Sequence, residues 1–268
     1  YDVLGISRDN KTSENVNLTY FNVDIFDTKK LAQNITGYDI LASAYSSGWE
    51  NPNMYQDFID GSLSMQQAAI KSKVKRYIVI GGAGSLYVTE SIQAVDTDEF
   101  PEIFKPGARA AREYFNLLKK DTSLDWLYLS PALEMHPGIT TGRTEKYRYG
   151  TMTPIFDEKG QSSISVEDLA VAVVDEIEEE KFNKTLKDGE RLFYKTIKHL
   201  DGGILSGADA FKLFDTFGFP LEMTMELASE NNLKVDEEGF KAKFKEHQEK
   251  SRALDAGAFK GGLADQSY

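Results

Sequence analysis

The strongest constraint on this chain is the alternation of short apolar runs with segments of helical periodicity over its first 176 residues. Strands that alternate with helices are typical of βαβ units around a mostly parallel sheet. The strand-like runs span residues 2–7, 16–24, 38–45, 76–80 and 124–129, and the helical stretches span 28–32, 54–72 and 107–119. The sequence therefore predicts an α/β fold with a doubly wound parallel sheet.

The alternation stops near Glu176. From there the chain shows charge-dense helical patterns and no convincing strand. These patterns span residues 176–187, 202–217, 223–231 and 237–252. We therefore expect two domains, an α/β domain over residues 1–176 and an α-helical segment over residues 177–268.

Composition excludes several classes of protein. The 268 residues contain no cysteine, which rules out a disulfide scaffold, a thiolate metal site and a cysteine nucleophile, and fits a reducing compartment. The three histidines have no partner at i+4, so no metal site is predicted. A net charge of −12 argues against a broad nucleic-acid surface, and no apolar run approaches the roughly 20 residues that a membrane helix needs. We expect a cytoplasmic protein that does not enter a membrane.

Two polar residues follow the first two predicted strands. Arg8 comes directly after the first strand, where an arginine can accept the 2′-phosphate of a dinucleotide or can be a solvated loop residue. Asp24 closes the second strand, where it can approach an adenine or can cap a helix. Both assignments remain open at this level.

Two further strand ends carry turn residues. Gly81-Gly82-Ala83-Gly84 follows the apolar strand at 76–80 and is interpreted as a phosphate cradle, a loop on the ligand side of the sheet, or a flexible turn. A phosphate cradle requires spaced glycines that open into a helix, whereas Ser85 and an apolar stretch follow here. Ser130-Pro131 can present backbone groups to a bound ring or can form a simple turn.

The order of these motifs resembles that of the NAD(P)H-binding, NmrA-like branch of the atypical short-chain dehydrogenases, which includes NADH-flavin reductase-like proteins. The motifs cover residues 1–180 and read VLGISRD, NVDIFD, GYDILASAY, VKRYIVIGGAGSL, PGAR, LDWLYLSPA, GRTEKYR and SISVEDLAVAVVDEIE. The resemblance implies a Rossmann-like domain that binds NAD(P)H. It places Arg8 near the adenosine phosphate, Asp24 near the adenine, and Ala44 with Tyr45 under the cofactor. The nicotinamide and substrate side would be bordered by Gly81, Gly82, Ala83, Ser85, Ser130, Pro131 and Ala132.

The sequence departs from this family in two respects. Members begin with a strand and a glycine-rich turn that hold the pyrophosphate, and VLGISRD corresponds to the segment after that turn. In the strand order 3-2-1-4-5-6 this element is the central strand, so we expect a sheet without its first strand and without the two ladders that strand would make. The Tyr-x-x-x-Lys pair of active short-chain dehydrogenases is also not found, since Phe104, Lys105 and Arg109 stand near its place. No catalytic residue is assigned.

Residues 178–268 resemble a second family, the helical tRNA-recognition region of alanyl-tRNA synthetase. The similar stretches are EEEKFNKTLKDGERLF, LSGADAFKLFDTFGFPLEMT and NNLKVDEEGFKAKFKEHQEKSRA. Ser206-Gly207 together with DTFGFP is the most specific piece, and Phe211, Leu213, Phe214 and Phe217 are predicted to pack together. The resemblance implies tRNA as a partner, although aminoacylation is not expected. Lys241, Lys243 and Lys245 share their helix with glutamates and are interpreted as a solvated face.

These observations support three hypotheses. The first is an NAD(P)H-binding oxidoreductase-like domain fused to a synthetase-derived segment, with a small-molecule or flavin substrate and NADP slightly favoured over NAD by Arg8. The second is a tRNA- or synthetase-associated binding module. The third is a chimera without an integrated function.

Overall fold

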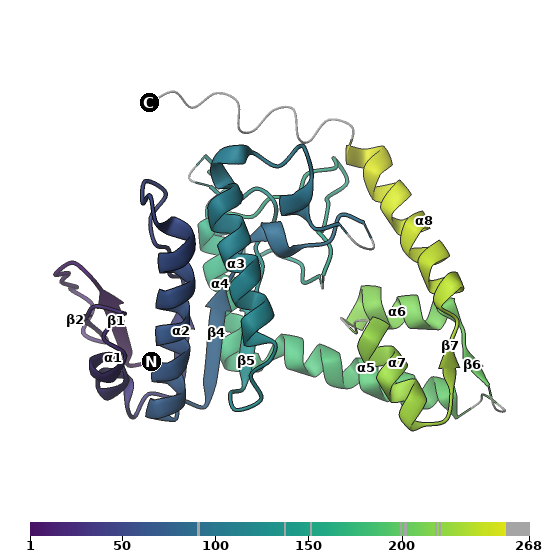
Figure 1. Ribbon diagram of the computed structural model, residues 1–268, viewed down its shortest axis with the longest axis horizontal. Coiled ribbons are helices and arrows are strands. Elements are labelled where there is room, and N and C mark those ends of the chain that lie inside the picture. Colours follow the sequence, from purple (N-terminus) through teal and green to yellow (C-terminus); the bar gives the residue numbers. More distant parts are fainter. Residues whose placement is uncertain are drawn as a thin grey trace. The chain divides into compact units, whose positions relative to one another are not determined.

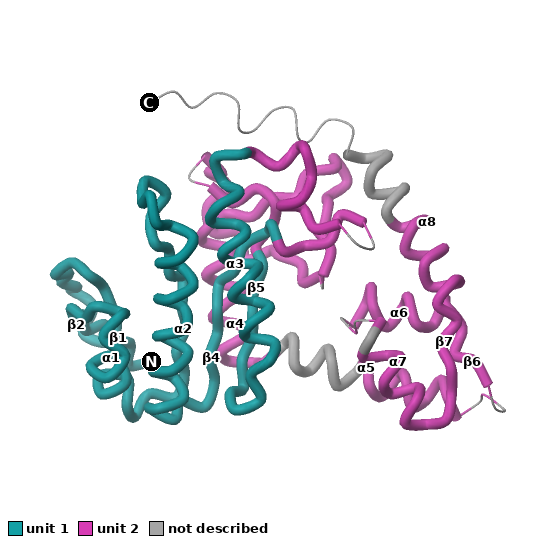
Figure 2. Tube along the Cα trace, in the orientation of Figure 1, with its two compact units in different colours: residues 1–84, 102–130 teal, residues 85–101, 131–268 magenta. Residues whose placement is uncertain are grey.

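The computed structural model describes residues 1–89, 92–136, 138–150, 152–198, 200, 203–217, 219 and 221–255. The chain divides into two compact units (Figure 2). Unit 1 consists of Tyr1–Gly84 and Glu102–Ser130, and unit 2 of Ser85–Pro101 and Pro131–Tyr268. The domain boundary expected at residue 176 lies within unit 2 and stays a prediction.

The described strands of unit 1 form two separate parallel sheets (Figure 1). Strand β1 (Val3–Ser7) pairs with β2 (Leu18–Asn22), and β4 (Arg76–Ile80) lies between β3 (Ile40–Ser43) and β5 (Trp126–Leu129). No ladder joins β1 to β3 in the part of the chain that the structure describes. The predicted α/β class with parallel strands is confirmed, and the break between the sheets lies where the missing central strand was expected.

Unit 1 contains three α-helices, and local sequence explains their limits. They are α1 (Thr28–Ile35), α2 (Met54–Ser72) and α3 (Lys105–Leu118). The Asp27 carboxylate accepts a hydrogen bond from Lys30 N at 3.0 Å and caps α1, while Lys73 adopts a left-handed conformation (φ 59°) that ends α2. Helix α2 packs between α1 and α3, so the three helices form one layer (Figure 1).

The core of unit 1 is built around two tyrosines. Tyr77 on β4 and Tyr114 on α3 are both fully buried, and the Tyr114 hydroxyl donates to the Tyr77 hydroxyl at 3.3 Å. Burial raises the pKa of Tyr77 to about 12. Leu31 from α1 and Met65 from α2 belong to the same cluster, so α1, α2, α3 and β4 share one core.

The sequence predicted a continuous helix over residues 176–187, and this prediction is wrong. In unit 2 the structure has two helices there, α4 (Val166–Glu179) and α5 (Lys181–Ile197). Glu180 separates the two helices because it adopts a left-handed conformation (φ 49°), with its N–H donating back to Glu176 O at 3.2 Å. A glutamate rarely takes this conformation, so the sequence carries no sign of the break.

The remaining elements of unit 2 include two strands that the sequence pattern did not predict. Strands β6 (Ile204–Leu205) and β7 (Lys234–Val235) pair in parallel among helices α6 (Gly207–Phe217), α7 (Leu221–Glu230) and α8 (Glu237–Asp255). Each strand has two residues, which is too short for an alternating pattern to appear.

Phenylalanine side chains form the core of this helical part. Phe214 lies 5.6 Å from Phe240 and 5.4 Å from Phe244 between ring centroids. Phe211 and Phe217 pack against the same cluster, to which Leu213 also belongs, as predicted. Gly218 and Pro220 of the DTFGFP motif, and His199, lie outside the described residues. None of the helices described here has the length and apolar character of a membrane span.

Gly207 allows α6 to approach α8. A Cβ at this position would lie 2.1 Å from the backbone N of Phe240, and Gly207 itself is buried. Ser206, directly before it, caps α6 by accepting from Asp209 N at 3.1 Å. The Ser206-Gly207 pair is therefore required by the packing of this segment.

We predict that Gly207→Ala lowers the free energy of unfolding by about 3 kcal/mol, the upper part of the range for overpacking, because a backbone atom cannot rotate away from the new methyl group. Urea unfolding followed by circular dichroism measures the change. The control is Ala208→Ser at the next, exposed position, expected within about 0.5 kcal/mol of the parent. Equal effects of the two substitutions would contradict the close packing of α6 and α8.

Candidate functional site

The carboxyl ends of β1, β2 and β3 bring three of the predicted site residues together. Arg8 and Asp24 are exposed, and Tyr45 is half-buried. The charges of Arg8 and Asp24 both act on the Tyr45 hydroxyl, the first lowering and the second raising its pKa. These effects are smaller than those of burial and of Asp57, and the net result is a raised pKa. Arg8, Asp24 and Tyr45 therefore lie around one edge of unit 1.

Tyr45 offers a flat, fixed surface at this edge. Its ring stacks on Phe58 with centroids 5.7 Å apart and an interplanar angle of 17°, and its hydroxyl donates to Asp57 O at 3.1 Å. Because the hydroxyl is held by a helix carbonyl and its pKa is raised, Tyr45 is suited to contact a ligand rather than to release a proton near neutral pH. Ala44, the residue before it, is exposed.

Asn22 and the turn after β2 hold the backbone around the other two residues. Asn22 Nδ2 donates to Arg8 O, which fixes the loop but leaves the guanidinium exposed. Asp24 Oδ1 accepts from Phe26 N at 3.0 Å, so this carboxylate stabilises the turn that leads into α1. The helix cap itself is Asp27. Asp24 thus has a local structural role, and one carboxylate oxygen remains for other contacts.

The glycine-rich stretch at the end of β4 is covered by an aromatic ring. A Cβ on Gly81 would lie 2.0 Å from the ring of Tyr128, whose hydroxyl donates to Ala111 O at 3.0 Å and interacts with the backbone of Gly82. Burial raises the pKa of Tyr128. Gly81 is therefore required by side-chain packing, independently of any ligand.

The same stretch does not open into an α-helix. It runs into a 3-10 turn over Ala83–Ser85, so it lacks the glycine turn and helix N-terminus that bind a pyrophosphate. Ser85 is buried and belongs to unit 2, where its carbonyl accepts from Gln93 Nε2 at 2.8 Å. This geometry argues against the phosphate cradle, and the loop on the ligand side of the sheet and the simple turn both remain open.

The last predicted group, Ser130, Pro131 and Ala132, follows β5 at the change from unit 1 to unit 2. Pro131 is buried, while Ser130 and Ala132 are partly exposed. The chain then continues through Leu133, whose N–H donates to Ser162 Oγ at 3.3 Å. Their contact with a ligand remains a prediction.

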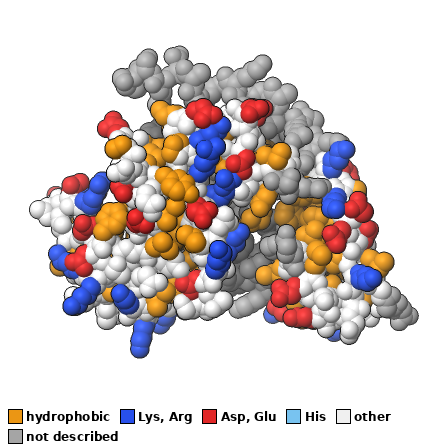
Figure 3. Space-filling view, viewed as in Figure 1, with side chains coloured by type: hydrophobic (Ala, Val, Ile, Leu, Met, Phe, Trp, Pro, Cys, Tyr) orange, Lys and Arg blue, Asp and Glu red, His pale blue; other side chains and the backbone are white. Residues whose placement is uncertain are grey.

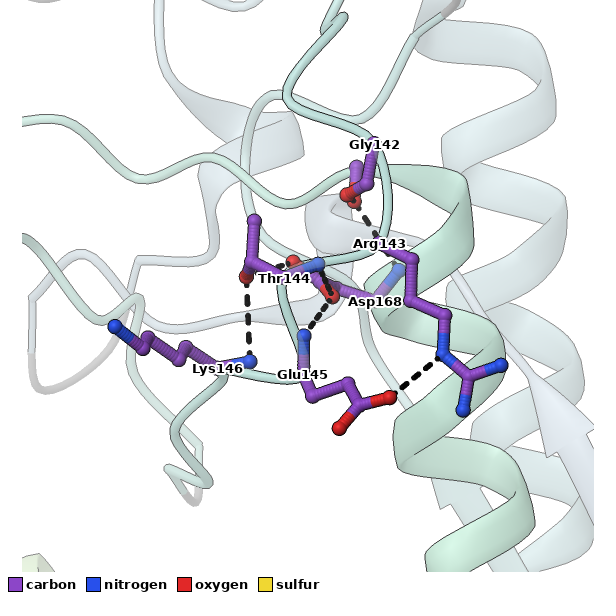
Figure 4. Close-up of polar contacts among 7 residues, drawn as sticks. Gly142, Arg143, Thr144, Glu145, Lys146 and Asp168 are labelled. Atoms are coloured by element: carbon purple, nitrogen blue, oxygen red, sulfur yellow. Dashed lines mark hydrogen bonds and ion pairs between the residues drawn. The ribbon is translucent and has the colours of Figure 1, made fainter.

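Sequence reasoning missed a buried carboxylate that organises a loop of unit 2 (Figure 4). Asp168 Oδ1 accepts from the backbone N of Thr144 and of Glu145, each at 2.8 Å, and Asp168 Oδ2 accepts from Thr144 Oγ1 at 2.6 Å. Ser165 Oγ donates to Gly142 O at 2.8 Å. Together these bonds fix residues 142–145 against the first turn of α4. The Thr144 hydroxyl, followed by the two amides, lowers the pKa of Asp168.

The signal for this arrangement was present in the sequence. Ser165-Val166-Glu167-Asp168 has the Ser-x-x-acid spacing of a helix N-terminus, and Ser165 Oγ accepts from Asp168 N at 3.1 Å as that pattern requires. The pattern predicts a cap but does not indicate that the Asp168 side chain turns to a loop more than twenty residues earlier.

No catalytic acid emerges near the place of the missing Tyr-x-x-x-Lys pair. Lys105 is bound to Glu102 at 2.5 Å, and Tyr114 is fully buried in the core of unit 1. Among the residues that the structure describes, no three or more metal-ligating side chains form a cluster. The site therefore has groups that can bind a ligand but no assigned proton donor.

Two lysines of α8 are paired with carboxylates. Lys241 Nζ lies 2.9 Å from Glu238 Oε1, and Lys243 Nζ lies 2.9 Å from Glu246 Oε2. On the face shown in Figure 3, positive and negative side chains lie next to one another. This arrangement supports the interpretation of a solvated helix face.

Comparisons with known proteins divide the chain between two families. The family described as NAD(P)H-binding matches residues 1–180, and the family described as tRNA synthetases class II (A) matches residues 149–265. The uncharacterized protein YwnB of Bacillus subtilis is 30% identical over 180 residues, which are 66% of this chain and 81% of YwnB. The crystal structure of a candidate NADH-flavin reductase from Streptococcus pneumoniae is 31% identical, with a TM-score of 0.58, and covers 66% of this chain and 81% of that chain.

The second part of the chain is similar to a small portion of a larger enzyme. The alanine–tRNA ligase of Borrelia hermsii is 50% identical over 92 residues, which are 34% of this chain. The chain spans only 16% of the length of that ligase. Both predicted resemblances are therefore confirmed, and the chain joins segments that are similar to two unrelated families.

We predict that Asp168→Asn lowers the free energy of unfolding by about 1–3 kcal/mol at pH 7, because a charged acceptor of three hydrogen bonds is lost. The pKa of Asp168 is lower in the folded protein, so its stabilising effect is present above the unfolded pKa of about 3.9 and is lost as the pH falls through the folded value. Urea unfolding from pH 7 down to pH 3 should show the difference between parent and variant shrinking below about pH 4.

The control is Glu167→Gln, which removes the same charge from the neighbouring, exposed position on the first turn of α4. It should change stability by less than about 0.5 kcal/mol. If Glu167→Gln lowered the free energy of unfolding as much as Asp168→Asn, the effect would come from charge at the helix terminus and not from the bonds to the loop.

Proposed function

This chain belongs to the NAD(P)H-binding family, and from that premise we propose that it binds a nicotinamide dinucleotide along the carboxyl ends of the strands of unit 1 and acts as an oxidoreductase on a small acceptor. The observation that carries the proposal is the placement of Arg8, Asp24 and Tyr45 just after the carboxyl ends of β1, β2 and β3. Ligands of parallel α/β sheets lie at this edge, because strand ends and loops there leave backbone and side-chain groups available.

The residues at this edge fit the adenosine end of the cofactor. Arg8 has an exposed guanidinium on a loop that Asn22 holds in place, and a guanidinium can bind a phosphate with two parallel hydrogen bonds. Asp24 carries a negative charge beside it and suits a ribose hydroxyl or an adenine amine. We propose NADP as the preferred form, with Arg8 binding the 2′-phosphate.

The remaining predicted residues would border the reactive end. In this proposal Ala44 and Tyr45 lie under the cofactor, and Gly81, Gly82, Ala83, Ser85, Ser130, Pro131 and Ala132 surround the nicotinamide and the acceptor. When bound, the nicotinamide supplies a hydride. The name of the Streptococcus pneumoniae structure supports a flavin as acceptor. We also propose a cytoplasmic location, because reduced dinucleotides are made there.

We expect NADPH to bind the 268-residue chain more tightly than NADH, as measured by titration of nicotinamide fluorescence. Arg8→Ala should weaken NADPH binding by about tenfold or more and change NADH binding by less than about twofold, because only the 2′-phosphate loses a charged partner. Lys30→Ala, at an exposed position on α1, removes the same charge and should leave the preference intact.

Absence of binding of both dinucleotides up to millimolar concentration would reject the proposal for this chain. If Arg8→Ala and Lys30→Ala weakened NADPH binding equally, the loss would come from the overall charge of the acidic chain. Arg8 would then not bind the 2′-phosphate.

A second candidate function rests on the 50% identity to the alanine–tRNA ligase of Borrelia hermsii. In this alternative the helical segment binds tRNA or a synthetase, and the α/β part senses a nucleotide without turnover. The pairing of Lys241 and Lys243 with glutamates leaves less positive charge for a phosphate backbone and favours the first function.

A gel-shift experiment with alanine tRNA distinguishes the two. A tRNA-binding module should shift the tRNA at low salt and lose the complex as salt rises, because phosphate contacts release counterions. We expect no shift at about 50 mM salt, a concentration at which even nonspecific contacts are strong. A salt-sensitive complex that a nonspecific RNA does not displace would replace the first function with the second.

A further inference from the structure

The loop between β3 and α2 carries an exposed tryptophan. Trp49 is 61% exposed, although tryptophan is among the side chains that gain most from burial. It belongs to unit 1 and lies on the same loop as Tyr45. Because this loop leaves the carboxyl end of β3, Trp49 lies at the edge of the unit where parallel sheets bind their ligands.

Hydrogen bonds hold the backbone of this loop in one conformation. Asn51 N donates to Gly48 O at 3.3 Å, which closes a turn that includes Trp49. Gly48 has a φ of 95°, a conformation that glycine adopts at no steric cost. The buried Ser47 Oγ donates to Met54 O at 2.9 Å and ties the turn to the start of α2. Trp49 is therefore attached to a fixed backbone although its side chain is exposed.

The indole ring itself is held from the side of α3. The ring of Phe104, directly before α3, lies 5.1 Å from the ring of Trp49 between centroids, with an interplanar angle of 76°. A Cβ on Gly107, in the first turn of α3, would lie 3.1 Å from Trp49 Cζ3, so the missing side chain at this position makes room for the ring. These contacts fix the indole and leave the larger part of its surface open to solvent.

Two more exposed apolar side chains come from the same two helix starts. Ile103, next to Phe104, is 76% exposed, and Tyr55, in the first turn of α2, is 42% exposed. Helices α2 and α3 both begin at the end of unit 1 toward which β4 points (Figure 1). Exposed apolar groups gathered in this way mark a binding site on a soluble domain.

The size of this surface favours a small ligand over a protein partner. An aromatic side chain covers about 150–250 Å² when fully buried, and Trp49, Ile103 and Tyr55 are already partly covered. Together they offer less apolar surface than the ~800 Å² per partner that a stable protein interface buries. A ring that is held in place before binding also loses little conformational entropy when a flat ligand stacks on it.

We propose that Trp49 is the platform on which a flat aromatic acceptor of two or three fused rings stacks. Phe104 and Gly107 position the indole for this contact. The platform selects conjugated ring systems, the class of isoalloxazines and quinones, over saturated carbonyl compounds, because only a π-system matches the face of the indole. The role of the ligand as acceptor rests on the proposed function, whereas the stacking itself requires no dinucleotide.

The test uses the two indole N–H signals in the proton–nitrogen NMR spectrum of the full 268-residue chain, one from Trp49 and one from Trp126. Trp126 Nε1 donates to Asp121 O at 3.2 Å and is the internal control. The probes are menadione and riboflavin, which are flat and uncharged, and the control ligand is decalone, a saturated two-ring ketone. The flat probes should move only the Trp49 signal, and decalone should move neither.

Three outcomes of this titration would overturn the proposal. They are a Trp49 signal that does not move with the flat probes at their solubility limits, equal movement with decalone, and equal movement of the Trp126 signal. A Trp49 signal that moves with the concentration of the chain alone would assign this surface to a second copy of the chain and would also overturn it.

Equilibrium dialysis with menadione measures the affinity of variants. Trp49→Ala should weaken binding by at least about tenfold, and Trp49→Phe, which keeps a flat ring, should stay within about threefold of the parent. The control is Tyr194→Ala, which removes an exposed aromatic side chain from α5 in unit 2 and should leave binding unchanged. Equal weakening by Trp49→Ala and Tyr194→Ala would show nonspecific attachment and contradict the platform.

A titration with NADPH separates this proposal from the proposed function. Menadione should bind with equal or higher affinity in the presence of NADPH, because acceptor and dinucleotide occupy different places. If NADPH moved the Trp49 signal and displaced menadione, the platform would hold a ring of the cofactor and the proposal would be overturned.

The two proposals fail in different ways. NADPH binding without menadione binding would reject only the platform. Menadione binding at Trp49 without NADPH binding would reject the proposed function and the acceptor role, while the site for a flat aromatic ring would stand.

Discussion

The structure of unit 1 depends on the requirement that strand backbone groups find hydrogen-bond partners. Strand β4 meets this requirement on both sides, lies between β3 and β5, and carries the fully buried Tyr77 at the centre of the core. Strands β1 and β3 meet it on one side only among the described strands, and their side chains are correspondingly more exposed. The loops that carry Arg8 and Tyr45 begin at the ends of these two strands, so the positions of β1 and β3 set where these two residues lie.

Side-chain hydrogen bonds to backbone groups play the second organising role. Asn22 fixes the loop of Arg8, and Asp168 fixes the loop over residues 142–145. In both cases a polar side chain satisfies backbone groups that no strand or helix would satisfy. These contacts give irregular segments defined conformations.

The helical segment has a different kind of stability. Its core is a cluster of phenylalanine rings around Phe214, and Gly207 allows two helices to approach closely. These features give the phenylalanines and Gly207 a structural role within the segment. The pairing of lysines with glutamates on α8 agrees with this structural role.

The sequence by itself determined the order of strands and helices in residues 1–130, the parallel α/β class and the similarity to two families, because apolar periodicity and motif order are local properties of the chain. It also indicated the break in the sheet and the packing of Phe211, Leu213, Phe214 and Phe217. Only the tertiary structure decided that Tyr128 covers Gly81, that Asp168 holds a loop, and that Glu180 separates two helices. The first two join residues far apart in the chain, and the third depends on a backbone conformation that glutamate rarely adopts, so no local pattern could reveal them.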